Sequence, residues 1–312
     1  MKQIPSLSFR KLQEKDLTTT KDLADVCQQS GYFRLVEVEF ENNKPELLLL
    51  EINNFFKLSG PEKKKLLRTE KNPWGYFDKE LTKNMQDWKE IFDLKFDRSD
   101  PNDEYKTPWP LMLPNFFETT NRWHQLCENI SLVILNSIER SLGLNVDSLA
   151  RFFTPFNSSF LRLNYYPACE TPADPKQSFP LKGNLGIHHH TDAGAITILL
   201  QDEVSGLQFR HKDTWQTISS EKNSLVINVG DLIQVWSNDL YKAPLHRVLA
   251  NKNQERFSAA FFMNPSSSTN CSPQTKEKAI YRSVNWAKFR SARAAGDYEN
   301  LGREIQISDY KI

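Results

Sequence analysis

Three of the six histidines form the consecutive run His188-His189-His190, and Thr191-Asp192 follows directly. Histidine and aspartate are common metal ligands, and residues i and i+2 of a β-strand point to the same face of the sheet. His190 and Asp192 could therefore reach one metal ion together. A third ligand would have to come from another strand, and His246 is the strongest candidate.

Two imidazoles and one carboxylate make the facial triad of non-haem iron(II) oxygenases, which leaves positions open for a cosubstrate and dioxygen. Other third ligands are weaker candidates, because His124 falls in a helical pattern and His211 in a polar turn. A histidine at a strand end before an aspartate in a turn would give the same short pattern without any metal. Zinc also binds such ligands in hydrolases, but here no paired general base accompanies them.

A second pattern, over residues 256–262, would place a positive charge in the same core. Strand alternation puts Arg256, Ser258 and Phe262 on one face. A buried guanidinium needs an anionic partner, and its planar fork matches a carboxylate. Arg256 and Ser258 therefore predict a carboxylate clamp, although an internal salt bridge to an Asp or Glu side chain is the alternative.

The segment over residues 160–166 follows the same alternation. Arg162, Asn164 and Tyr166 share one face, and polar groups that face a barrel interior indicate a ligand cavity. The alternative is that this face meets solvent. Arg162 could anchor an acidic group of a substrate, or it could pair with acidic side chains nearby.

The elements that must position these residues differ between the two halves of the chain. Hydroxyls at residues 18–20 predict the start of a helix over about 21–30, and a strand over 32–40 should follow. Further helices are expected over about 45–57, from Asn115 to Gly143, and over 284–295. Short segments of high β-propensity predict strands over residues 160–166, 195–200, 207–210, 224–229, 232–236 and 256–263.

Such a series of short strands favours a mainly β core, a jelly roll, with flanking α-helices over a parallel sheet. We expect a helix-rich region with short strands over residues 1–158, the catalytic core over 159–265 and a helical extension over 266–312. The three parts should form one compact unit.

Composition limits the classes of partner. Lys and Arg number 40 and Asp and Glu 39, so no basic excess predicts binding to nucleic acid or to a membrane surface. The four cysteines are scattered without a CxxC pair, which fits a reducing compartment. No segment has the apolar pattern of a signal peptide or a membrane span. We therefore expect a cytoplasmic monomer that acts on a small molecule.

Over nearly its whole length the sequence resembles the plant-type 2-oxoglutarate and iron(II)-dependent dioxygenases, the family that includes isopenicillin N synthase. The resemblance depends on the order of several motifs, which are Gly31-Tyr32-Phe33, Asp87-Trp88-Lys89-Glu90-Ile91-Phe92-Asp93, Leu163-Asn164-Tyr165-Tyr166-Pro167, His190-Thr191-Asp192-Ala193-Gly194, Ser205-Gly206-Leu207-Gln208, Asn228-Val229-Gly230-Asp231, residues 241–248 and Arg256-Phe257-Ser258.

The resemblance implies a distorted double-stranded β-helix that binds Fe(2+) through His190, Asp192 and His246, with 2-oxoglutarate and O2 as cosubstrates. It implies that Arg256 and Ser258 hold the distal carboxylate of 2-oxoglutarate. By the same resemblance Tyr166 assists at that carboxylate and Asn164 lies near the metal. Hydroxylation of the substrate, with release of succinate and carbon dioxide, is the expected outcome.

Two rival functions stay open. Oxidases of the same fold that do not consume 2-oxoglutarate keep the triad and the Arg-x-Ser pair, and a ligand-binding relative could keep the fold without catalysis. Candidates for the substrate pocket are Arg162, Phe262, His188 and Tyr76. His188 shares the parity of His190 if the strand is regular, although a surface position at the strand entry is the alternative. Tyr76 could cover the site.

Overall fold

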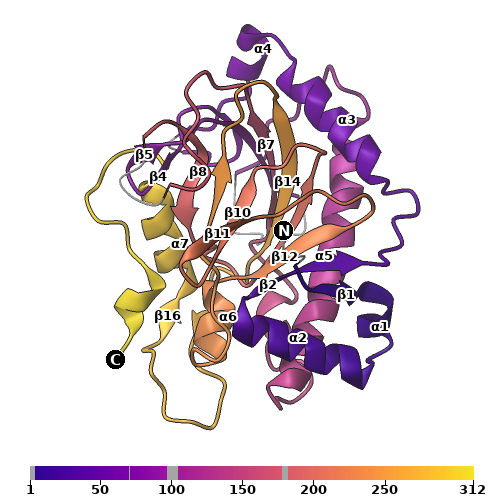
Figure 1. Cartoon of the computed structure of the whole chain (residues 1–312), viewed down its shortest axis with the longest axis vertical. Coiled ribbons are helices and arrows are strands. Elements are labelled where there is room, and N and C mark those ends of the chain that lie inside the picture. Colours follow the sequence, from indigo (N-terminus) through magenta and orange to yellow (C-terminus); the bar gives the residue numbers. More distant parts are fainter. Residues whose placement is uncertain (1–3, 70, 97–104, 178–181) are drawn as a thin grey trace.

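The computed structural model describes residues 4–69, 71–96, 105–177 and 182–312. Within these ranges, one large sheet contains strands from both halves of the chain (Figure 1). Its strands, in sheet order, are β1 (Ser6–Ser8), β2 (Tyr32–Val36), β12 (Leu225–Val229), β9 (Ile196–Gln201), β14 (Arg256–Met263), β7 (Phe160–Tyr166), β6 (Glu90–Leu94) and β3 (Gly75–Phe77).

A smaller sheet supplies the second layer of the core. Its strands, in sheet order, are β11 (Thr214–Thr217), β10 (Leu207–His211), β13 (His246–Leu249) and β8 (Leu185–His190). Two short pairs complete the described strands: β4 (Leu81–Thr82) with β5 (Met85–Gln86), and β15 (Asn270–Cys271) with β16 (Val284–Asn285). Side chains from both main sheets line one cavity, so the predicted jelly-roll core is confirmed.

Helices flank this core, as expected. They are α1 (Phe9–Gln13), α2 (Leu17–Gln29), α3 (Pro45–Phe56), α4 (Gly60–Lys64), α5 (Phe116–Ser141), α6 (Asp231–Trp236) and α7 (Trp286–Ala295), with short 3-10 turns at Ala150–Phe153 and Ile307–Tyr310. α3 and α5 contact the outer face of β14, while α7 lies on the other side of the molecule (Figure 1).

Strand β14 shows why the core and the site can share one sequence segment. Ala259 and Phe261 are fully buried, and the Phe261 ring lies edge-on to His124 of α5, 5.0 Å between centroids. The alternate residues Arg256, Ser258 and Phe262 line the cavity. The alternation predicted for residues 256–262 is therefore observed.

One predicted element has the wrong secondary structure. Residues 232–236 form helix α6 rather than a strand, because Gly230 and Asp231 begin a helical turn and the apolar residues that follow are buried all round. A short apolar segment that is buried on every side has no periodicity that separates helix from strand. Helix α2 also starts earlier than expected, because Asp16, and not the threonines, accepts the capping hydrogen bond from the Thr19 amide, 2.7 Å away.

Candidate active site

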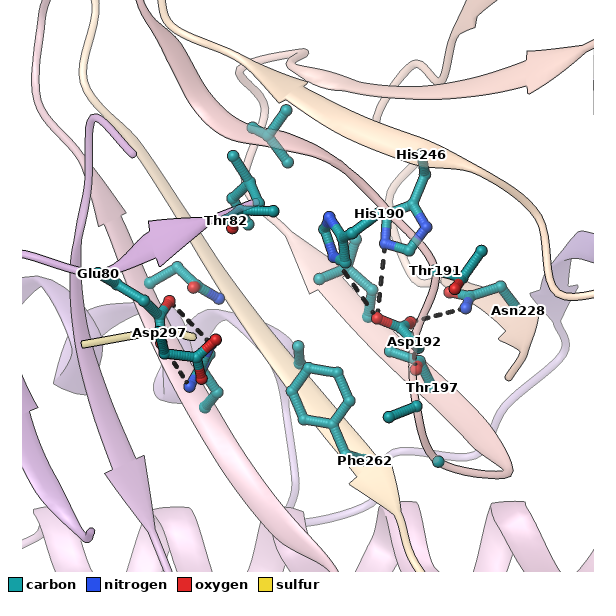
Figure 2. Close-up of a pocket in the computed structure, with 18 of the residues that line it drawn as sticks. Glu80, Thr82, His190, Thr191, Asp192, Thr197, Asn228, His246, Phe262 and Asp297 are labelled. Carbon is teal, nitrogen blue, oxygen red and sulfur yellow. Dashed lines mark hydrogen bonds and ion pairs between the residues drawn. The ribbon is translucent and has the colours of Figure 1, made fainter. Parts of the chain in front are cut away.

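His190, Asp192 and His246 converge where β8 ends and β13 begins, although His246 is far from the other two in sequence (Figure 2). His190 pairs with His246 across the two strands, and Asp192 follows two residues after the end of β8. The Nε2 atoms of His190 and His246 each lie 3.6 Å from Oδ1 of Asp192. The three ligand atoms lie within 4.8 Å of one another, so one ion can bind to all three.

Neighbouring groups fix both imidazoles in the form that binds a metal. Nδ1 of His190 lies 2.8 Å from the carbonyl of His188, and Nδ1 of His246 lies 3.1 Å from the carbonyl of Pro244. Each Nδ1 therefore carries the proton, which leaves the lone pair of Nε2 free. Burial, followed by the charge of His246, lowers the pKa of His190 to about 3, so its ring is neutral at physiological pH.

Asp192 is held by two donors that the sequence did not reveal as functional. The Thr197 hydroxyl and the Asn228 amide donate to Oδ2 of Asp192 at 2.6 and 2.8 Å, which turns Oδ1 toward the histidines. Burial alone would raise the pKa of Asp192, but the two histidines and these two hydrogen bonds outweigh it and hold the pKa below its usual value. Two neutral imidazoles and a carboxylate fit a ferrous ion.

Removal of one of these donors should weaken iron binding. Thr197→Val keeps the side-chain shape but removes the hydroxyl, and we expect the dissociation constant for iron(II) to rise by roughly 10- to 100-fold. An anaerobic iron(II) titration measures this change. Thr214→Val, at the exposed first position of β11, is the matched control and should bind iron as the unaltered chain does. Equal affinities for the two variants would contradict the orienting role of Thr197.

Arg256 and Ser258 lie on the β14 face that lines the same cavity. Arg256 is 2% exposed, donates from Nε to the carbonyl of Val204 and from Nη2 to Oε1 of Gln201, both at 3.1 Å, and has its Cζ 4.9 Å from the centre of the Tyr166 ring. Within the described ranges, its Nη1 has no hydrogen-bond partner. A buried donor of a charged group is costly to leave unpaired, so this atom indicates a missing anionic ligand.

Ser258 and Asn164 form the adjacent wall of the cavity. They are paired across β14 and β7, and the Asn164 amide donates to the Ser258 hydroxyl at 3.3 Å. Oδ1 of Asn164 is buried and also lacks a partner in the described part of the chain. Gly186 allows the Tyr166 ring to approach, because a Cβ there would lie 2.7 Å from that ring.

His188 does not line the cavity, contrary to its parity with His190. Between the two register points His246–His190 and Val248–Ile187, β8 has one residue more than β13, so the strand contains a bulge. Ile187 and His190 therefore face the cavity. His188 is buried behind it, with its Nδ1 2.9 Å from Asp87, so the alternative of a surface position is wrong as well.

Tyr76 does not line the cavity either. It lies on β3, which pairs with β6, and its hydroxyl donates to Glu90 at 2.8 Å. Its ring packs near Phe55 of α3, away from the triad. The prediction that Tyr76 covers the site is not supported by this position.

Arg162 lines the cavity, but its charge is already neutralised. Its Nε and Nη2 donate to the two carboxylate oxygens of Asp93 at 2.7 and 2.8 Å, and its Nη1 donates to Glu80 at 3.0 Å. Glu80 also pairs with Lys89 at 2.6 Å. The structure therefore favours the alternative of local acidic partners over a substrate anchor.

Asp297 follows α7 and lines the cavity next to this charged cluster; Figure 2 shows it beside Glu80. Burial, followed by the negative charge of Glu80, raises the pKa of Asp297 from 3.8 to about 7. Between these two values the folded chain holds a proton that the unfolded chain has released. The contribution of Asp297 to stability is therefore lost as the pH rises toward and through 7.

Asp297→Asn removes this titration. We expect the free energy of unfolding of the variant minus that of the unaltered chain to be larger at pH 8 than at pH 5 by on the order of 2 kcal/mol, so that the variant is relatively more stable at pH 8. Other groups titrate in both proteins, so the difference isolates Asp297. Denaturant unfolding at the two pH values measures it, with Asp213→Asn at an exposed position as the control. A difference that does not change with pH would contradict the assignment.

Two family models match the chain. The 2OG-Fe(II) oxygenase superfamily matches residues 157–265, and the N-terminal region of non-haem dioxygenases in morphine synthesis matches residues 4–118. Jasmonate-induced oxygenase 4 of Arabidopsis thaliana is 32% identical over 279 residues, which cover 85% of this chain and 75% of the relative. Thebaine 6-O-demethylase of Papaver somniferum is 29% identical, and the match covers 87% of this chain and 72% of that enzyme.

Solved structures give the same result. The crystal structure of JOX2 in complex with 2OG, Fe and JA has a TM-score of 0.81 at 26% identity and covers all of this chain and 90% of that one. A full-length protein of Neurospora crassa, solved in complex with alpha-KG and thymine, has a TM-score of 0.79 at 26% identity, with 94% of this chain and 96% of that one covered. These matches confirm the resemblance and the fold predicted from the sequence.

Proposed function

Because the chain belongs to the family of 2-oxoglutarate and iron(II)-dependent oxygenases, we propose that it hydroxylates a small organic molecule at the cavity described above. His190, Asp192 and His246 are the proposed iron ligands. Arg256 and Ser258 are proposed to bind the distal carboxylate of 2-oxoglutarate, with Tyr166 and Asn164 beside it.

One observation carries the assignment of the cosubstrate site. The cavity that holds the triad also holds a buried guanidinium with one nitrogen, Nη1 of Arg256, that is unpaired among the residues the structure describes. A carboxylate that accepts from Nη1 and from the Ser258 hydroxyl would satisfy this donor, and such charge-assisted bonds are short and strong. The alternative of an internal salt bridge finds no support, since no carboxylate of the described residues pairs with Arg256.

The cofactor and the protein have separate tasks. When bound, iron(II) together with 2-oxoglutarate supplies the oxidation chemistry. Arg256 and Ser258 orient the cosubstrate, while the carbonyls of His188 and Pro244 hold the proton on each Nδ1 and keep Nε2 aimed at the metal. Apolar side chains that line the cavity exclude water between the clamp and the triad: Ile187, Leu199, Leu207 and Val248.

The direct test is succinate formation from 2-oxoglutarate by the purified chain with iron(II) under air. We expect succinate and carbon dioxide in equal amounts, and substrate should stimulate the rate. Oxygen consumption without succinate would instead indicate the rival oxidase that does not use 2-oxoglutarate. No oxygen consumption with any cosubstrate would indicate a ligand-binding relative.

The relatives do not identify the substrate, because they are named after, or were solved with, different molecules, which are jasmonate, thebaine and thymine. We propose that the chain is a cytoplasmic monomer, in which residues 159–265 are the catalytic core, residues 1–158 a helix-rich flank and residues 266–312 a helical extension. Pairing of β2 with β12, and of β6 with β7, supports a single compact unit. No helix of the described ranges is long and apolar enough to cross a bilayer.

A further inference from the structure

Besides the triad and Arg256, several charged side chains line the cavity, and Figure 2 shows two of them, Glu80 and Asp297, on the side away from the triad. These lining residues are Glu80, Lys89, Arg162, Arg290, Arg293, Asp297 and Glu304. Most of the charges neutralise one another in short ion pairs, and a charge that is already paired has little to offer a ligand.

The paired members form two groups. In the first, Glu80 binds Lys89 at 2.6 Å and Arg162 at 3.0 Å, and the remaining nitrogens of Arg162 bind Asp93. In the second, Nε of Arg293 binds Glu304 at 2.9 Å and its Nη2 donates to the carbonyl of Thr191. In both groups each cation that lines the cavity is therefore paired with at least one carboxylate.

Arg290 differs from the cations of these two groups, because no ion pair of this kind holds it among the described residues. It lies on α7, and its Cζ is 5.4 Å from the centre of the Phe160 ring. Within the part of the chain that the structure describes, its guanidinium makes neither a hydrogen bond nor an ion pair. It lines both the cavity of the triad and a neighbouring cavity bounded by Trp74 and Tyr298.

Asp297 is the exception among the anions. It lies seven residues after Arg290 and lines the same two cavities. Its side chain likewise makes no hydrogen bond or ion pair to the residues described, and no ion pair within 4.0 Å joins it to Arg290, although the two charges attract each other. The guanidinium of Arg290, a donor, and the carboxylate of Asp297, an acceptor, thus line the same cavity, and their two charges nearly cancel.

We infer that Arg290 and Asp297 form the recognition site for the polar end of the substrate, and that this end is an uncharged group with an acceptor beside a donor, such as an amide or lactam. Arg290 donates to the carbonyl oxygen of that group and Asp297 accepts from its N–H. The stacked rings of Phe160 and Phe262, 4.9 Å between centroids, line the path from this site to the triad. The inference rests on the proposed function, since it names the class of substrate for the same cavity.

Charge balance argues against the two ionic alternatives. A carboxylate would gain Arg290 but would meet the negative charge of Asp297 in the same cavity. A cation would gain Asp297 but would meet the positive charge of Arg290. Like charges in a buried site repel strongly, whereas an amide satisfies both groups without adding charge.

Three probes of similar shape test this inference: neutral benzamide, anionic benzoate and cationic benzamidinium. Calorimetry with the full chain, loaded anaerobically with iron(II) and 2-oxoglutarate at pH 8, gives the dissociation constants. We expect benzamide to bind at least about tenfold more tightly than either ion. Tightest binding of benzoate or of benzamidinium would overturn the inference, and so would the absence of binding by all three.

Two substitutions should change the preference in opposite directions. Arg290→Gln leaves Asp297 unbalanced, so benzamidinium should become the tightest of the three probes. Asp297→Asn leaves Arg290 unbalanced, so benzoate should become the tightest. Lys288→Gln removes a positive charge from the exposed face of the same helix and should leave the order unchanged. An order that neither of the first two substitutions alters would contradict the assignment.

Failure of this inference can be distinguished from failure of the proposed function. Succinate formation from 2-oxoglutarate in the absence of any probe depends on the triad and the clamp, but not on the substrate site. A chain that forms succinate yet prefers an ionic probe contradicts the amide site alone. A chain that forms no succinate contradicts the proposed function itself.

Discussion

Asp192→Ala should lower the rate of succinate formation at least about 1000-fold, which corresponds to ~4 kcal/mol of activation free energy. Oδ1 of Asp192 lies 3.6 Å from each of the two histidine nitrogens and is the one negatively charged donor of the triad. Without it, two neutral imidazoles remain, and they hold a divalent ion weakly. The rate is measured with saturating iron(II) and 2-oxoglutarate.

The control for this variant is Asp213→Ala. The Asp213 side chain is 98% exposed and pairs with Arg210 at 3.5 Å on the surface, so its loss should leave the rate unchanged. Far-ultraviolet circular dichroism of both variants establishes that they fold. A folded Asp192→Ala chain that turns over at more than a tenth of the normal rate would contradict the role of Asp192.

Arg256→Ala should raise the KM for 2-oxoglutarate about 100-fold or more. The guanidinium is buried, and loss of one partner from a buried, hydrogen-bonded charge pair costs roughly 2–5 kcal/mol. Iron(II) affinity should change little, because none of the Arg256 hydrogen bonds reaches the triad. Steady-state kinetics with varied 2-oxoglutarate, together with an iron(II) titration, separates the two effects.

Two further variants make this prediction specific. Arg256→Lys keeps the positive charge but loses the planar fork, so its KM should lie between those of Arg256→Ala and the unaltered chain. Arg210→Gln removes an exposed arginine from the smaller sheet and should leave the KM unchanged. If Arg256→Ala lost iron binding and 2-oxoglutarate binding equally, the clamp would not be the site of the cosubstrate.

The chemistry of the centre could be predicted from the sequence because strand geometry is simple. Alternation along residues 256–262 placed Arg256, Ser258 and Phe262 on one face, and the structure shows that face lining the cavity. The convergence of His190, Asp192 and His246 followed from the few histidines present and from the resemblance.

Other features depended on information that no local pattern contains. A bulge in β8 turned His188 away from the cavity, and one extra residue in a strand leaves no clear mark on sequence alternation. The ion pairs of Arg162 come from β6 and from Glu80, which are distant in sequence. Nothing in the sequence singles out Arg290, because its lack of a partner among the described residues is visible only in the structure.

The most direct test of the account is an anomalous difference map from crystals grown anaerobically with iron(II) and 2-oxoglutarate. One iron peak is predicted, bonded to Nε2 of His190, Nε2 of His246 and Oδ1 of Asp192, with a carboxylate of 2-oxoglutarate on Nη1 of Arg256. An iron peak elsewhere, or a triad without iron beside bound 2-oxoglutarate, would contradict the account.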